Sequence, residues 1–68
     1  MFNELEFNGA RARKGYTRET LAKELEISPV TLWRKVKRGG DFSRAEINTI
    51  IDVLSIEPDE RDRIFFAS

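Results

Sequence analysis

The chain has 68 residues with no cysteine and no histidine, and its twelve basic and twelve acidic side chains give a formal net charge of zero. The missing residue types exclude disulfide bonds, thiolate nucleophiles, zinc sites of the usual kind and imidazole bases. A chain this short is expected to form a single domain, residues 1–68, that buries roughly 60% of its unfolded surface and is marginally stable.

The first predicted helix spans about residues 4–14. Asn3 followed three residues later by Glu6 is typical of a helix start. Phe7 and Ala10 are its expected core contacts. The glycine after this segment is expected to end the helix.

Two short helices are predicted next, at about residues 18–25 and 29–37, with only a sharp bend between them. Thr17 is expected to cap the first, and Ser28 followed by Pro29 is a strong start signal for the second. One face of each helix is apolar: Leu21, Ala22 and Leu25 in the first, Leu32 and Val36 in the second.

A fourth helix is predicted at about residues 44–54, where Ser43 and Glu46 form a capping box, and a short last helix runs from Pro58 to about Phe66. The fourth helix carries an apolar stripe at helical spacing: Ile47, Ile50, Ile51 and Leu54. Because no segment alternates as a strand does, we expect an all-α fold, a compact bundle of five helices around one core.

Positive charge is concentrated in the middle of the chain. Residues 11–44 hold ten basic and four acidic side chains, which gives +6, whereas residues 1–10 carry −2 and residues 45–68 carry −4. This distribution is typical of a nucleic-acid-binding surface, although an ordinary solvated face could also produce it.

Segment 17–37 resembles the helix-turn-helix of the lambda-repressor and Cro-like family of phage-type regulators. The residues that carry the resemblance are Thr17, Leu21-Ala22, Leu25, Ile27-Ser28, Leu32 and Val36, and the flanks Lys14-Gly15-Tyr16, residues 41–47 and Ile64-Phe65-Phe66 agree with it. One position departs from the family pattern: the bend usually holds glycine, because its backbone is left-handed, but here it holds Glu26. A non-glycine residue there costs about 1 kcal/mol.

The resemblance implies a lambda-repressor-like DNA-binding domain whose recognition helix, about residues 29–37, enters the major groove of double-stranded operator DNA. The predicted DNA-binding or partner-binding residues are Arg18, Ser28, Pro29, Val30, Thr31, Trp33, Arg34, Lys37 and Arg38. Arg34 could bond guanine through its planar fork, or it could contact a phosphate or stay solvated. Pro29 and Val30 could touch only thymine methyl groups. Thr31 could either touch a methyl group or form a hydrogen bond with a base.

Arg18, Lys37 and Arg38 are candidates for phosphate contacts, as are Lys35 and Arg44, although each could instead be a solvated surface cation. Trp33 is unusual on a recognition helix. It could pack against the loop at residues 37–40, anchor a protein interface, or contact DNA.

Phe2, Phe65 and Phe66 are expected to form an apolar patch that joins the two chain ends. Core packing would explain all three, whereas exposure of one would indicate a dimer contact or a partner surface. The acidic start of the chain has no apolar run of the kind a signal peptide carries, and no apolar run is long enough to span a bilayer, so we expect a cytoplasmic protein without membrane contact.

Two functions follow from these observations. The first is a phage or prophage transcriptional regulator that binds operator DNA, forming a homodimer there because one small module reads few base pairs. The alternative is a modulator or antirepressor that binds another phage repressor protein through the same surface. Zero net charge, the acidic last third and the apolar residues Pro29, Val30 and Trp33 favour the alternative. No nucleophile–base pair or phosphate-binding loop is present, so the sequence predicts no enzyme, cofactor or metal site.

Overall fold

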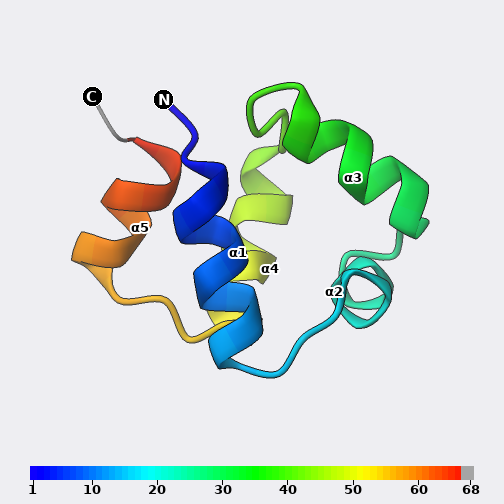
Figure 1. Ribbon diagram of the computed structural model, residues 1–68, viewed down its shortest axis with the longest axis horizontal. Coiled ribbons are helices and arrows are strands. Elements are labelled where there is room, and N and C mark those ends of the chain that lie inside the picture. Colours follow the sequence, from blue (N-terminus) through cyan, green and yellow to red (C-terminus); the bar gives the residue numbers. More distant parts are fainter. Residues whose placement is uncertain (67–68) are drawn as a thin grey trace.

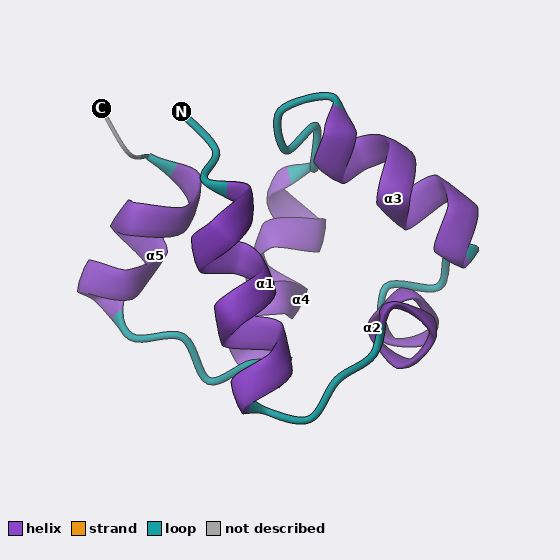
Figure 2. Ribbon diagram, in the orientation of Figure 1, coloured by secondary structure: helices purple, strands orange, loops and turns teal. Residues whose placement is uncertain are grey.

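In the computed structural model, which describes residues 1–66, the chain forms five α-helices and no strand (Figures 1 and 2). The helices are α1 (Glu4–Arg13), α2 (Arg18–Glu24), α3 (Pro29–Lys37), α4 (Arg44–Val53) and α5 (Pro58–Phe65). The all-α prediction is confirmed, and every predicted helix agrees with these bounds to within one residue at either end. None of the described helices is long and apolar enough to cross a membrane.

Local capping explains why the helices begin where they do. The side chains of Asn3, Thr17, Ser28 and Ser43 each accept a hydrogen bond from the backbone N–H three residues later, at 3.1 to 3.2 Å. Each bond satisfies an N–H group that the first turn of a helix would otherwise leave without a partner. α5 begins differently, because no side chain caps it and Pro58 fixes its first turn.

The core lies between all five helices. Its buried apolar residues are Phe7, Ala10, Leu21, Ala22, Leu32, Val36, Ile50, Leu54, Ile56, Ile64 and Phe65. α2 and α3 pack on each other at one end of the molecule, and α1 packs beside α5 at the other (Figure 1). The residues of the predicted apolar stripe on α4 are not equally buried: Ile50 is buried, whereas Ile47 and Ile51 are only partly covered.

Four phenylalanine rings from distant parts of the chain form one cluster, which we call the phenylalanine cluster: Phe2, Phe7, Phe42 and Phe65. Neighbouring rings have centroids 5.5 to 6.4 Å apart. The backbone N–H of Asn3 also donates to the Ile64 carbonyl at 2.7 Å, so the two ends of the described chain lie side by side (Figure 1). Phe66 lies at the edge of the cluster, with its ring centroid 6.4 Å from that of Phe65, and is 60% exposed.

Each of the four turns between helices contains a residue with positive φ, and two of these turns lie next to α3. Glu26, between α2 and α3, has a φ of 58°, so the bend is left-handed although its residue is not glycine. In the loop between α3 and α4, Gly40 has a φ of 76°, and a Cβ atom there would lie 2.4 Å from Cγ of Phe2. Only glycine therefore allows this loop to approach the phenylalanine cluster so closely.

Candidate functional site

α3 lies at one edge of the molecule, with one face on the core and the other toward solvent (Figure 1). Leu32 and Val36 are buried, as predicted for the inner face. The α3 outer face consists of Pro29, Val30, Trp33, Arg34, Lys37 and the capping residue Arg38, all of which are exposed. The structure thus brings together six of the nine predicted site residues on one surface.

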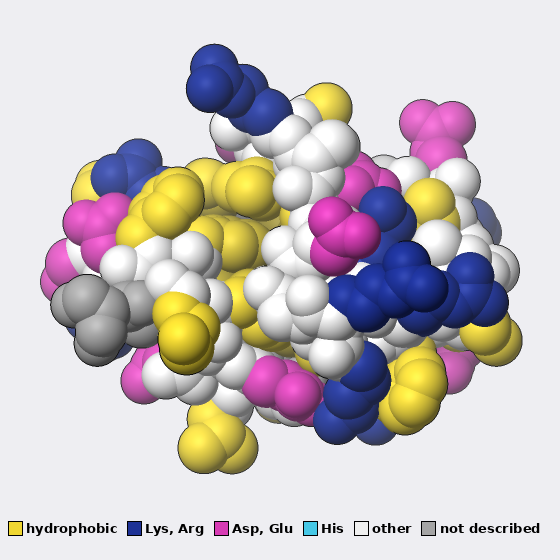
Figure 3. Space-filling view, turned by 90° about the horizontal axis from the view of Figure 1, so that it is seen from above, with side chains coloured by type: hydrophobic (Ala, Val, Ile, Leu, Met, Phe, Trp, Pro, Cys, Tyr) yellow, Lys and Arg dark blue, Asp and Glu magenta, His cyan; other side chains and the backbone are white. Residues whose placement is uncertain are grey.

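The α3 outer face is strongly basic. α3 contains no acidic residue, and its last turn carries Arg34, Lys35 and Lys37. Arg34 and Arg38 form no ion pair with any described residue, so their guanidinium groups are available to a ligand. In Figure 3, Lys and Arg side chains form a continuous run at the end of the molecule where Figure 1 places α3.

The predicted lysine contacts are less available than the arginines. Lys37 Nζ lies 2.9 Å from Glu4 Oε2 of α1, and Lys35 Nζ lies 3.3 Å from Glu46 Oε1 of α4. Both lysines therefore tie α3 to the rest of the fold. A phosphate group would have to compete with a carboxylate for either of them.

The hydroxyl groups at the start of α3 are occupied by the helix cap. Ser28 Oγ accepts the backbone N–H of Thr31 at 3.1 Å and donates to Thr31 Oγ1 at 2.9 Å. Thr31 is also half-buried. The first turn of α3 therefore presents mainly the apolar side chains of Pro29 and Val30.

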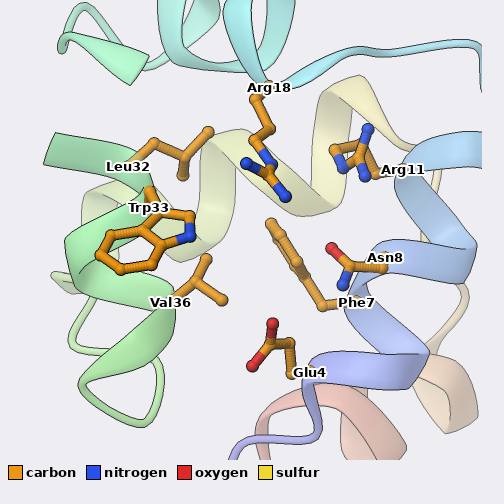
Figure 4. Close-up of a pocket in the computed structure, with 8 residues that line it drawn as sticks. All are labelled: Glu4, Phe7, Asn8, Arg11, Arg18, Leu32, Trp33 and Val36. Atoms are coloured by element: carbon orange, nitrogen blue, oxygen red, sulfur yellow. The ribbon is translucent and has the colours of Figure 1, made fainter. Parts of the chain in front are cut away.

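Arg18, the first residue of α2, is exposed and forms no ion pair within the described part of the chain. Figure 4 shows its guanidinium group pointing into a hollow between α1 and α3, with Trp33 on one side and Arg11 on the other. The residues that line this hollow are Glu4, Phe7, Asn8, Arg11, Arg18, Leu32, Trp33 and Val36. Arg18 and Arg11 therefore line the same hollow beside the α3 outer face.

Arg11 was not predicted as part of the site. Its Nη1 donates to the Tyr16 carbonyl at 2.7 Å, whereas its Nε is buried without a hydrogen-bond partner. The only sequence signal was its membership of the basic segment. Glu4, which also lines the hollow and pairs with Lys37, gave no signal at all because its partner lies 33 residues away.

Trp33 forms a ridge between two hollows. One is the hollow shared with α1, and the other is lined by Arg18, Glu19, Pro29, Val30 and Trp33 itself. The indole is 47% exposed, and Lys37 Nζ lies 5.8 Å from the ring centroid. The Lys37 contact is within range of a cation–π interaction and covers part of the ring.

The helix at the opposite end of the molecule from α3 has an acidic first turn. α5 begins with Asp59 and Glu60, and in Figure 1 it occupies the end farthest from α3. Arg13 forms an ion pair with Glu60, and Arg63 lies 3.7 Å from Glu6, so much of this acidic surface is paired with α1 or with its own arginines. The first turn of α5 thus differs in charge from the last turn of α3, which is basic.

Glu46, which pairs with Lys35, is the one described group with a clear pKa shift. Burial alone would raise the pKa of Glu46, but the backbone N–H of Ser43, the Lys35 ammonium and the Ser43 hydroxyl together hold this pKa below its ordinary value. Glu46 therefore stays ionised and keeps Lys35 and the start of α4 in place.

A second apolar surface lies between α4 and α5. Its hollow is lined by Arg44, Ile47, Asn48, Ile51, Arg61 and Phe66. Phe66 is the exposed member of the predicted patch at the chain ends. Among the described residues there is no cluster of acidic side chains that could hold a metal ion. Comparisons with protein families, with curated proteins and with solved structures find no match to this chain.

Proposed function

We propose that this protein is a small transcriptional regulator of the helix-turn-helix, phage-repressor type that binds operator DNA by placing α3 in the major groove. The observation that carries the proposal is the α3 outer face. It is exposed, free of acidic residues, and holds two arginines, Arg34 and Arg38, that form no ion pair with the described residues.

The dimensions of α3 suit this role. An α-helix with its side chains is about 10–12 Å wide, which matches the major groove of B-DNA. Arg34 extends from the middle of the exposed face, where its fork can bond the edge of a guanine. Arg18, the first residue of α2, is exposed, and its charge suits a contact with a phosphate.

One copy of the protein can read only a short sequence. α3 has nine residues, so it is roughly 13 Å long and spans about four base pairs. A useful operator would therefore contain two half-sites bound by two copies. The exposed Phe66, beside the half-buried Ile47 and Ile51, supplies apolar surface for contact between the copies.

The proposal is tested by selecting bound sequences from a library of random duplexes and then measuring mobility shifts with the enriched sequence. Enrichment of a two-fold symmetric sequence, with affinity that falls as salt rises, is the expected result. If no sequence is enriched and no shift occurs at low salt, the proposal is wrong.

The apolar residues on α3 favour a second candidate function, the binding of another phage repressor. Val30 is 64% exposed and Trp33 is 47% exposed. Exposed tryptophan often anchors protein interfaces, and its truncation to alanine would weaken repressor binding by about thirtyfold or more. Titration with a phage repressor encoded in the same genome tests this function. Binding is monitored by tryptophan fluorescence, which reports on Trp33 because the chain has no other tryptophan.

A further inference from the structure

The first turn of α3 has an unusual chemistry for a surface that faces DNA. Pro29 and Val30 are both exposed, and Val30 at 64% is more exposed than Trp33 at 47%. Neither side chain can donate or accept a hydrogen bond. The adjacent hydroxyl groups of Ser28 and Thr31 bond each other within the helix cap. This turn therefore presents apolar surface to whatever it meets.

We propose that this turn reads thymine, through contact of Val30 and Pro29 with the C5-methyl group. This inference rests on the proposed function, since it assigns a base to part of the same surface. The C5-methyl of thymine is the apolar group that base pairs display in the major groove, whereas the other groups there are donors and acceptors. An apolar side chain against a donor or acceptor would leave that polar group without a partner, which is unfavourable.

The spacing along α3 places this thymine relative to the guanine that Arg34 would contact. Val30 and Arg34 are four residues apart, so they lie on the same face and about 6 Å apart along the helix axis. With α3 lying along the groove, this distance corresponds to about two base pairs. Each half-site should thus contain a thymine and a guanine separated by about one intervening base pair.

The surrounding charges favour DNA over a protein as the group that covers this turn. Arg18 lines the hollow beside Pro29 and Val30, and Arg34 follows one helical turn later. Both are cations without an ion-pair partner among the described residues, and Glu19 is the one carboxylate in the hollow. A methyl group flanked by a phosphate and a guanine edge matches an apolar turn flanked by Arg18 and Arg34.

The test replaces thymine by deoxyuridine, one position at a time, in the sequence enriched from the random library. Deoxyuridine lacks only the C5-methyl, so the base pair and its polar edge remain. At one position in each half-site, the loss of the methyl should weaken binding by about fourfold, which corresponds to one buried methylene-sized group. Deoxyuridine at the other thymine positions should leave the affinity unchanged.

Two variants assign the effect to this turn. Val30→Ala should lower the ratio of the affinity for thymine to the affinity for deoxyuridine, because the smaller side chain makes less contact with the methyl group while Pro29 remains. Arg34→Ala should weaken binding but preserve the ratio. The deoxyuridine substitutions are measured with the unaltered protein, so that measurement does not depend on the folding of either variant.

Two results would overturn the inference and leave DNA binding intact. The first is that deoxyuridine at every thymine position leaves the affinity unchanged. The second is that Val30→Ala does not change the loss of affinity caused by removing the methyl group. If no duplex is enriched at all, the proposed function fails and this inference fails with it. Loss of repressor binding in Val30→Ala, together with no DNA binding, would assign the apolar turn to a protein partner.

Discussion

Lys37 on α3 and Glu4 in the first turn of α1 form an ion pair, with 2.9 Å between Lys37 Nζ and Glu4 Oε2. The pair places a carboxylate at the border of the α3 outer face and occupies a cation that would otherwise be available to phosphate. Both side chains remain partly exposed, so the pair adds little to stability. Its larger effect should be on ligand binding.

Glu4→Gln should therefore strengthen DNA binding, because it frees Lys37 and removes a negative charge near the phosphates. The slope of log affinity against log salt should become steeper by about one as Lys37 gains a phosphate contact. Asp59→Asn, on α5 at the far end, makes the same change in net charge and should leave the slope unaltered. Equal effects of the two variants would mean that only total charge matters.

Arg18→Ala and Arg34→Ala should weaken DNA binding in different ways. Arg18→Ala should lower the affinity for all sequences about equally, because phosphate contacts carry no sequence information. Arg34→Ala should relax the preference at one base pair of each half-site, by about 1–3 kcal/mol of discrimination. Mobility shifts with the enriched sequence and its single-base variants distinguish the two. Arg63→Ala on α5 is the matched control, and a similar loss there would contradict both assignments.

Leu32→Ala should destabilise the domain by about 2–4 kcal/mol, because it leaves a cavity where α2 and α3 pack together. Leu32 is 1% exposed. Thermal unfolding followed by circular dichroism gives the change. Val30→Ala, on the same helix but 64% exposed, should shift the midpoint far less. Similar midpoints for the two variants would mean that the faces of α3 are assigned wrongly.

Glu26→Gly should stabilise the domain by about 1 kcal/mol, because it removes the strain of a left-handed backbone from a residue with a Cβ atom. The φ of 58° at Glu26 is the relevant observation. Lys23→Gly, inside α2, should have the opposite sign and destabilise by a similar amount. Urea unfolding of both variants measures the sign of each change in the free energy of unfolding. A loss of stability in Glu26→Gly would mean that the left-handed backbone at Glu26 is not strained.

Glu46 should make stability depend on pH in the acidic range. The folded-state pKa of Glu46 lies below its ordinary value, so its contribution is fully present above the unfolded pKa and is lost as pH falls through the folded pKa. Glu46→Gln should be less stable than the unaltered protein at neutral pH, with a difference that shrinks on acidification. Lys35→Met should weaken the pH dependence without abolishing it, because Ser43 still donates to Glu46. Urea unfolding at several pH values measures all three proteins.

The helices and their starts could be predicted from the sequence because their determinants are local. Thr17, Ser28 and Ser43 cap backbone groups only three residues away, and the apolar spacing within each helix fixes its inner face. The site was predicted less completely. The pairing of Lys37 with Glu4 and the approach of Gly40 to Phe2 join residues more than thirty positions apart, and no local pattern encodes them.

Trp33 shows the same limit. Its place on the exposed face of α3 follows from helical spacing, but its position between two hollows depends on how α1 and α2 pack around it. Arg11 likewise belongs to the basic segment by sequence, yet it turns toward the Tyr16 carbonyl instead of joining the α3 outer face.

The phenylalanine cluster also determines when this domain can fold during synthesis. Phe2 contacts both Phe42 and Phe65, so rings that are synthesised early, midway and late within this domain must meet. Until α5 has left the ribosome, Phe2 and Phe42 lack the ring that completes the cluster, and the contacts that close it are among the longest in the chain. We expect nascent chains stalled after α4 to be readily cleaved by proteases and to become resistant only once residues 58–65 are free to pack.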